Sequence, residues 1–130
     1  MKSKEEINEL THRIIGCAMT VHNTLGNGFQ EVIYQRALAI EFRYQNISFV
    51  REMDMELFYR SEPIGTRRVD FFVEGEVMLE LKAVEVLNGI HKAQAINYCE
   101  AYNMPDGLLI NFGSTSLQYH RVFNKKIKRL

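Results

Sequence analysis

Hydrophobic residues recur at intervals of three and four over the first part of the chain, the spacing of amphipathic helices. Ser3 and Glu6 form a capping box, and the apolar stripe that follows extends to Val21. Gly26 suits the left-handed conformation in which many helices end. A second stretch with helical spacing covers about residues 30–44. The sequence therefore begins with two predicted helices.

Beyond Ile47 the spacing changes to an alternation of two, which is typical of a half-buried strand. Residues 53–59 carry the clearest alternation. Two further apolar segments, residues 68–73 and 77–83, flank Glu74-Gly75-Glu76. Because a short loop with glycine between two such segments favours a β-hairpin, we expect these segments to pair.

The rest of the chain predicts one more helix and one or two strands. The helix covers about residues 90–102, after Asn88-Gly89. Residues 107–112 form a nearly continuous apolar run, typical of a strand covered on both faces, and residues 117–123 can add a last edge strand. The order α-α-β-β-β-α-β(-β) predicts an α/β (α+β) fold, a mixed sheet flanked by helices, and we expect one domain over residues 1–130.

The apolar phase of each element also predicts a core. In the second helix, Ile33, Ala37 and Ile40 share one face, which we expect to point inward. Cys17 and Cys99 have apolar neighbours, and we expect reduced core thiols rather than a disulfide. The residues predicted to be largely buried are Ile14, Val21, Ile33, Ala37, Leu57, Phe72, Leu79, Leu109 and Ile110.

Composition narrows the function only a little. The 130 residues include 16 Lys and Arg and 16 Asp and Glu, so the formal net charge is zero. An anionic partner must therefore be met by a local basic patch or by a bound cation. No apolar run approaches the ~20 residues that cross a bilayer, and none follows the N-terminal charges as in a secretory signal. We expect a cytoplasmic protein with no membrane partner.

Three charged residues interrupt the predicted hairpin, and they are the first candidates for chemistry. Asp70 lies in one apolar strand, and Glu80 and Lys82 lie in the other. Residues two apart on a strand share a face, so Glu80 and Lys82 point the same way. A charge in a hydrophobic strand needs a partner, a metal or solvent. The hairpin alone is also compatible with a solvated face that carries a weak ion pair.

Other polar residues have an ordinary structural explanation beside the functional one. Glu31 lies in the first turn of the second helix, where a carboxylate favours the helix dipole. Gln94 and Tyr98 lie four apart in the third helix and share a face, which can be a polar flank. His22 and His91 are each compatible with a partly exposed histidine.

Together these residues resemble a family. Residues 28–34, Gly-x-x-Glu-x-x-Tyr, are similar to the signature of the GxxExxY proteins, part of the PD-(D/E)XK nuclease superfamily. Asp70 followed by Glu80-Leu81-Lys82 resembles the split D…ExK motif of that superfamily. Residues 94–98 match its QxxxY motif, and Asn111-Phe112-Gly113 resembles a strand ending of the family.

The resemblance runs from about Ile7 to Arg121, with Val69 at the position where the superfamily name has proline. It implies Mg²⁺-dependent hydrolysis of phosphodiester bonds, with Mn²⁺ as a substitute. The proposed metal ligands are Asp70, Glu80, the backbone carbonyl of Leu81, and Glu31, which can act instead as a water anchor. Hard oxygen ligands of this kind suit Mg²⁺.

The remaining roles follow from the same resemblance. Lys82 would orient or deprotonate the attacking water, Gln94 would fix the water or the metal shell, and Tyr98 would contact a phosphate. We expect Arg68 and His91 to contact nucleic acid as well, with DNA as the substrate. So short a chain leaves little room for a separate reading domain, so specificity would need a homodimer or a partner protein. The alternative is a catalytically silent module of the same fold that binds nucleic acid or a protein.

The length of the hairpin loop decides whether Asp70 and Glu80 can share a metal ion. A two-residue turn would place Asp70 and Glu80 on opposite sides of the sheet, where they could not share an ion. A three-residue loop, Glu74-Gly75-Glu76, sets them directly opposite each other, with β-carbons about 4.5–5.5 Å apart. We therefore predict an odd-length loop or a bulge. The residues expected together on one face are Asp70, Glu80 and Lys82, beneath Glu31 and Gln94.

Overall fold

A computed structural model describes residues 2–126 of the chain. Its elements follow the predicted order, and the last edge strand is present. They are α1 (Lys4–Leu25), α2 (Glu31–Tyr44), β1 (Phe49–Tyr59), β2 (Glu62–Val73), β3 (Val77–Lys82), α3 (Gly89–Ala101), β4 (Asp106–Asn111) and β5 (Gln118–Phe123).

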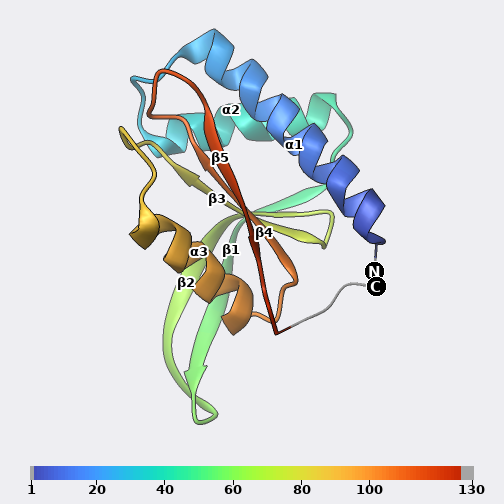
Figure 1. The fold of residues 1–130 in the computed structure, drawn as a ribbon, viewed down its shortest axis with the longest axis vertical. Coiled ribbons are helices and arrows are strands. Elements are labelled where there is room, and N and C mark those ends of the chain that lie inside the picture. Colours follow the sequence, from blue (N-terminus) through green and yellow to red (C-terminus); the bar gives the residue numbers. More distant parts are fainter. Residues whose placement is uncertain (1, 127–130) are drawn as a thin grey trace.

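The five strands form one mixed sheet in the order β1-β2-β3-β4-β5. All neighbours pair antiparallel except β3 and β4, which are parallel and are connected through α3. The prediction of a mixed sheet flanked by helices is confirmed (Figure 1). The capping box of α1 is present, and Gly26 caps that helix with a φ of 75°.

Helices cover the sheet on two sides and create two cores. The larger, which we call the α1–α2 core, packs α1 and α2 against side chains of β2, β3 and β4. The smaller, the α3 core, packs α3 against the sheet through Val69, Met78, Ala95, Cys99, Leu109 and Val122. Cys17 and Cys99 are free and buried, as predicted.

The predicted inward face of α2 is wrong by about one position. Ile40 is 49% exposed, and Ile33 and Ala37 are only half-buried. Tyr34 and Phe42 are fully buried instead. Phe42 packs edge-on against Phe71 of β2, and Tyr34 stacks on Phe112, just after β4. These tertiary contacts decide which face of a helix with a weakly defined stripe points inward.

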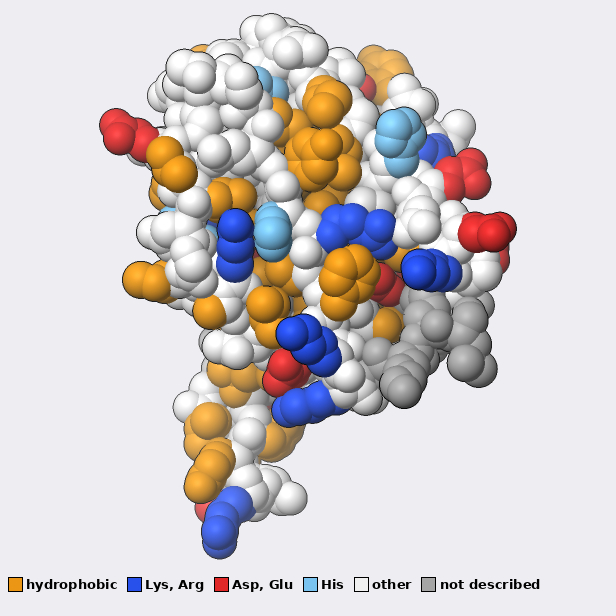
Figure 2. All heavy atoms as spheres, in the orientation of Figure 1, with side chains coloured by type: hydrophobic (Ala, Val, Ile, Leu, Met, Phe, Trp, Pro, Cys, Tyr) orange, Lys and Arg blue, Asp and Glu red, His pale blue; other side chains and the backbone are white. Residues whose placement is uncertain are grey.

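Two strand residues of the predicted core, Leu57 and Phe72, are also only half-buried. The β1–β2 hairpin extends beyond the helices (Figure 1). Leu57 pairs with Gly65 in the distal part of this hairpin, so it is only partly covered. Figure 2 shows hydrophobic side chains along this projecting hairpin, which include the exposed Phe58, Tyr59 and Ile64. Ile14, Val21, Leu79, Leu109 and Ile110 are buried as predicted.

The end of β4 and the residues just after it hold the segment that follows β3. Asn111 is fully buried, and its Oδ1 accepts a hydrogen bond from the backbone N–H of Val84 at 2.9 Å. Its Nδ2 donates to the carbonyl of Val84 at 2.8 Å and to Oε1 of Gln118 at 2.9 Å. A β-carbon at Gly113 would lie 2.3 Å from the carbonyl oxygen of Val84, so only glycine fits there. The Asn-Phe-Gly sequence therefore fixes the chain just beyond Lys82.

No helix in the described part of the chain combines the length and apolarity needed to cross a membrane.

Candidate active site

Glu80 is a carboxylate buried in β3 and only 4% exposed. Its Oε2 accepts a hydrogen bond from Nη2 of Arg67 at 3.1 Å, whereas its Oε1 is buried without a hydrogen-bond partner. Burial raises the pKa of Glu80 to about 7, and the charge of Asp70 acts in the same direction. Arg67 and Lys82 oppose this rise only in part. A cation beside Oε1 would therefore favour the ionised form.

Asp70 lies where the side-chain alternation of β2 slips by one residue. Phe71 packs in the α1–α2 core, yet Val69, two residues earlier, packs in the α3 core. Residues two apart on a regular strand share a face, so the backbone turns between them. Across from this point, Glu52 of β1 has a left-handed φ of 56°. The β2–β3 pairing ends at Phe71 and Leu79, so β2 and β3 separate at Asp70.

The Asp70 carboxylate occupies the gap between the two strands. Its Oδ2 accepts a hydrogen bond from the backbone N–H of Leu81 at 2.8 Å, in place of a strand carbonyl. Backbone N–H groups of a strand lie close to the plane of the sheet, so this carboxylate does too. Its Oδ1 accepts from Nε2 of Gln35, a buried residue of α2, at 2.9 Å. Asp70 is thus held from both β3 and α2.

The predicted geometry is confirmed for the loop and corrected for Asp70. Val73 pairs with Val77, so the loop has three residues, and the two left-handed φ values fall at Glu74 and Gly75. Asp70, however, does not project from the face that carries Glu80. The slip in β2 turns it into the plane between the strands, where its charge still acts on Glu80. The two carboxylates are therefore neighbours across the separation of β2 and β3, and they do not lie on opposite faces.

The α3 side of the site brings together six polar side chains. Glu80 and Lys82 share this face of β3, as predicted. They pack against residues of α3 so closely that no water-sized cavity remains between them. The guanidinium carbon of Arg67 lies 4.8 Å from the centre of the Tyr98 ring. The six residues are Arg67, Glu80, Lys82, His91, Gln94 and Tyr98.

Glu31 approaches from the other helix layer, so the prediction that it and Gln94 lie over the same face is wrong. It is exposed at the start of α2, and partial desolvation is the main cause that raises the pKa of its carboxyl group. Lys82 has the next largest effect and lowers this pKa, while the charge of Asp70 raises it. These couplings place Glu31 near both residues. The site therefore spans the sheet at the point where β2 and β3 separate.

Tyr34 explains why the segment before α2 holds Glu31 in place. Its hydroxyl donates to the carbonyl of Gly26 at 2.5 Å and accepts from the backbone N–H of Phe29 at 3.2 Å. Its ring stacks on Phe112, with the ring centres 4.6 Å apart. The tyrosine of the Gly-x-x-Glu-x-x-Tyr signature thus fastens the loop that contains its glycine to the core, and the glutamate begins the helix that follows this loop.

The two histidines have different positions. His22 is buried, and its Nε2 lies 2.9 Å from the carbonyl oxygen of Ser114, which connects α1 to the turn after β4. His91 lies at the start of α3, where its Nδ1 accepts from the backbone N–H of Asn88 at 3.3 Å. His91 also lines the site and lowers the pKa of Glu31. Of the two, only His91 is near the carboxylates.

Two residues that the sequence did not single out contribute to the site. Gln35 holds Asp70, and its place four residues after Glu31 on one helix face was a usable signal. Arg67 reaches Glu80, whereas its neighbour Arg68 points away and pairs with Asp54 at 3.0 Å. The structure therefore does not bring Arg68 to the site. A regular strand would have put Arg68 on the side of Asp70, and the slip in β2 prevents this.

The donor set fits one hard cation with few protein ligands. Within residues 2–126, no group of three or more His, Cys, Asp or Glu side chains is arranged to hold a metal. Asp70 and Glu80 supply two carboxylates, and Oε1 of Glu80, which has no hydrogen-bond partner, is available as a metal ligand. The carbonyl of Lys82 accepts a hydrogen bond from the backbone N–H of Phe112, on the β4 side. Carbonyls of successive strand residues point in opposite directions, so the carbonyl of Leu81 faces β2 and the gap beside Asp70. Oxygen donors completed by water are the environment that Mg²⁺ prefers.

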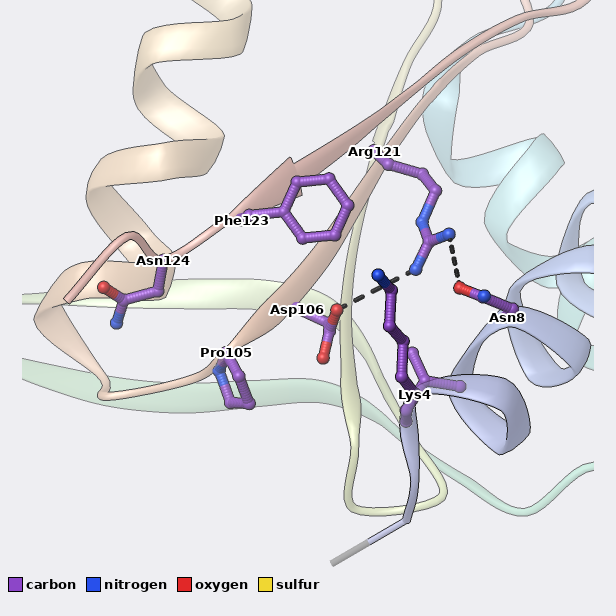
Figure 3. A pocket seen from close by; sticks show the side chains of 8 residues that line it. Lys4, Asn8, Pro105, Asp106, Arg121, Phe123 and Asn124 are labelled. Carbon is purple, nitrogen blue, oxygen red and sulfur yellow. Dashed lines mark hydrogen bonds and ion pairs between the residues drawn. The ribbon is translucent and has the colours of Figure 1, made fainter. Parts of the chain in front are cut away.

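A separate hollow of about 270 Å³ lies between the start of α1 and β4–β5 (Figure 3). There Arg121 donates to Oδ1 of Asn8 at 2.8 Å and lies 3.9 Å from Oδ1 of Asp106. Asp106 begins β4, whereas Lys82 pairs with its last residue, so this hollow lies toward the other end of the strands. The buried polar side-chain atoms without a partner in residues 2–126 belong to Gln35, Arg67 and Glu80. They mark the candidate site.

Comparison with known proteins agrees with this geometry. The family model described as the PD-(D/E)XK nuclease superfamily matches residues 8–122. No curated protein gives a significant match. Among solved structures, the crystal structure of SSO0001 is similar, with 16% identity and a TM-score of 0.56, over 72% of this chain and 50% of that one. The chain spans about half of that protein, and the similarity is one of fold. The match over residues 8–122 shows that the chain belongs to the PD-(D/E)XK nuclease superfamily.

Proposed function

We propose that this protein is a Mg²⁺-dependent nuclease that hydrolyses phosphodiester bonds of DNA. The observation that supports it most is the arrangement at the separation of β2 and β3. There Asp70 lies in the plane of the sheet beside Glu80, whose Oε1 is buried and unpartnered, and Lys82 follows two residues later. Superfamily membership supports the class of reaction.

Asp70, Glu80 and the carbonyl of Leu81 would hold the ion, and Mn²⁺ can replace Mg²⁺. A divalent ion bound there lowers the pKa of a water molecule and polarises a phosphate oxygen. Gln35 contributes indirectly, because its hydrogen bond keeps Asp70 turned into the gap. Two carboxylates supply about the charge of the ion, so a net charge of zero for the whole chain is compatible with an anionic substrate.

The other side chains act on water and phosphate. The ammonium group of Lys82 orients the attacking water and offsets negative charge that develops on the phosphoryl oxygens. Glu31 anchors water from the α2 side, and Gln94 does so from the α3 side. Tyr98 and His91, which lie on the same side as Gln94, would contact the phosphate.

The proposal includes a cellular compartment and a source of sequence specificity. Both cysteines are free and buried, as in most proteins of a reducing compartment, and we place the activity in the cytoplasm. We propose that sequence specificity comes from a second copy or a partner protein.

The test is a cleavage assay with plasmid DNA, single-stranded DNA and single-stranded RNA. Each substrate is incubated with the protein and Mg²⁺ or Mn²⁺, and in a separate reaction with the protein and a chelator. We expect DNA cleavage that the chelator abolishes and that Lys82→Met reduces by about 10²–10⁴-fold. Lys4→Met, an exposed lysine of α1 that lines the separate hollow, is the matched control and should cleave like the parent protein. Absence of cleavage with every substrate and both metals would contradict the proposal and favour a catalytically silent binding module.

A further inference from the structure

Arg67 is the cation that lies against Glu80 in this structure. Its Nη2 lies 3.1 Å from Oε2 of Glu80, and its guanidinium group lies over the ring of Tyr98. The two partners differ in exposure, because the side chain of Glu80 is 5% exposed and that of Arg67 is 35% exposed. One end of the pair is therefore fixed in the protein, and the other reaches solvent.

The contact between them is incomplete. Arginine and a carboxylate that are paired for structure alone frequently form two parallel hydrogen bonds. Here a single bond is formed, and both Nε of Arg67 and Oε1 of Glu80 stay buried without a partner. Unsatisfied buried polar atoms cost free energy, so this pairing is easier to break than a bidentate one.

The packing requires Arg67 to move before an ion can approach Glu80 from the α3 side. The side chains around Glu80 leave no water-sized space, and Arg67 is one of those that fill it. Arg67 belongs to the part of β2 beyond Phe71, where the pairing with β3 has ended. Its backbone pairs with Met55 of β1 and not with β3, so the side chain alone links it to Glu80. Displacement therefore needs only the guanidinium to turn toward the solvent that this side chain already reaches.

We propose that Arg67 is an internal counter-cation that a divalent ion displaces from Glu80 and that then binds a phosphate of the nucleic acid. This inference rests on the proposed nuclease function. A buried carboxylate without a cation is costly, so Arg67 stabilises Glu80 in the metal-free protein. With the ion in place, two cations would repel each other, and the guanidinium turns to the nearest anion. Its planar set of donors matches a phosphate.

Two binding measurements at pH 8 test the exchange. Mn²⁺ binding is followed by electron paramagnetic resonance, and binding of a single-stranded DNA oligonucleotide in the presence of Ca²⁺ is followed by fluorescence anisotropy. Arg67→Met should bind Mn²⁺ about tenfold more tightly, since the ion no longer displaces a charged hydrogen bond. The same variant should bind the oligonucleotide about tenfold more weakly. A residue that only supports the structure would weaken both.

Arg43→Met is the matched control, because Arg43 also lies over an aromatic ring, that of Phe49, at 5.8 Å. It should change neither affinity. If Arg67→Met does not fold, Arg67→Gln, which keeps a hydrogen-bond donor without the charge, takes its place and should show the same opposite changes. Mn²⁺ binding by the parent protein that is lost in Glu80→Ala but unaffected by Arg67→Met would overturn this inference alone. No Mn²⁺ binding by the parent protein would overturn the proposed function and this inference with it.

Discussion

Glu80 combines burial, a single charged partner and an unpartnered oxygen atom, and this combination has consequences for stability as well as for chemistry. Desolvation raises its pKa from a usual 4.5 to about 7, and the charge of Asp70 adds to the effect. Protonation of Glu80 therefore stabilises the metal-free fold below about pH 7, and its ionised form needs a cation, which is Arg67 when no metal is bound. The same residue connects folding, pH and metal binding.

Glu80→Gln should remove one component of the pH dependence of stability. Because the folded-state pKa lies above the unfolded value, protonation of Glu80 stabilises the fold fully below about pH 4.5, and this contribution is lost as the pH rises to about 7. Thermal denaturation in chelator should show the parent protein losing stability relative to Glu80→Gln between these pH values, and no further above them. The loss should be at most about 3–4 kcal/mol, since one pKa unit corresponds to about 1.4 kcal/mol. A difference that stays constant across the range would contradict the assignment.

At the scale of elements, local sequence signals predict most of the fold. Capping residues, alternation and glycine placement give the helices, the strands and the three-residue loop between Val73 and Val77. The inward face of α2 could not be predicted from its own residues, because Phe112 and Phe71, far along the chain, select Tyr34 and Phe42. The slip at Asp70 was equally hidden. It arises because Val69 packs in one core and Phe71 in the other. The sequence of β2 does not show this, because the two cores form only when the helices pack on the sheet.

β4 supplies the most direct stability test of the sheet. All its residues are buried, and Leu109 packs in the α3 core beside Glu80 of β3. Leu109→Ala should destabilise the protein by about 2–5 kcal/mol, because it removes buried methyl groups and leaves a cavity. Urea denaturation measures the change, with Tyr119→Ala on exposed β5 as a control that should cost much less. If Leu109→Ala unfolds at the urea concentration of the parent protein, β4 is not the buried strand described here.

At the scale of the whole molecule, the site depends on elements far apart in the sequence. The start of α2 brings Glu31, the separation of β2 and β3 brings the two other carboxylates, and α3 brings Gln94 and Tyr98. The motifs indicated which residues belong together, but not that the site crosses the sheet. That crossing follows from the two helix layers on opposite faces and from the gap that Asp70 fills.

Divalent metal should stabilise this assembly. Asp70, Glu80 and Glu31 carry like charges near one another, and an ion that binds the folded state relieves their repulsion. Mn²⁺ at 100 times its dissociation constant should add about 2.7 kcal/mol, seen as a rise in melting temperature at pH 8. Glu80→Ala should abolish the rise, and Glu62→Ala at the tip of the β1–β2 hairpin should leave it intact. A rise that persists in Glu80→Ala would place the ion elsewhere.

The position of the ion tests the central claim most directly. Crystals of the protein soaked in Mn²⁺ and measured for anomalous scattering show where the metal binds. The account predicts one strong peak at the separation of β2 and β3, within about 2.0–2.6 Å of oxygen atoms of Asp70 and Glu80 and of the carbonyl of Leu81. It also predicts that Arg67 has left Glu80. A peak at any other place, with Asp70 and Glu80 unchanged and Arg67 still bound to Glu80, would contradict it.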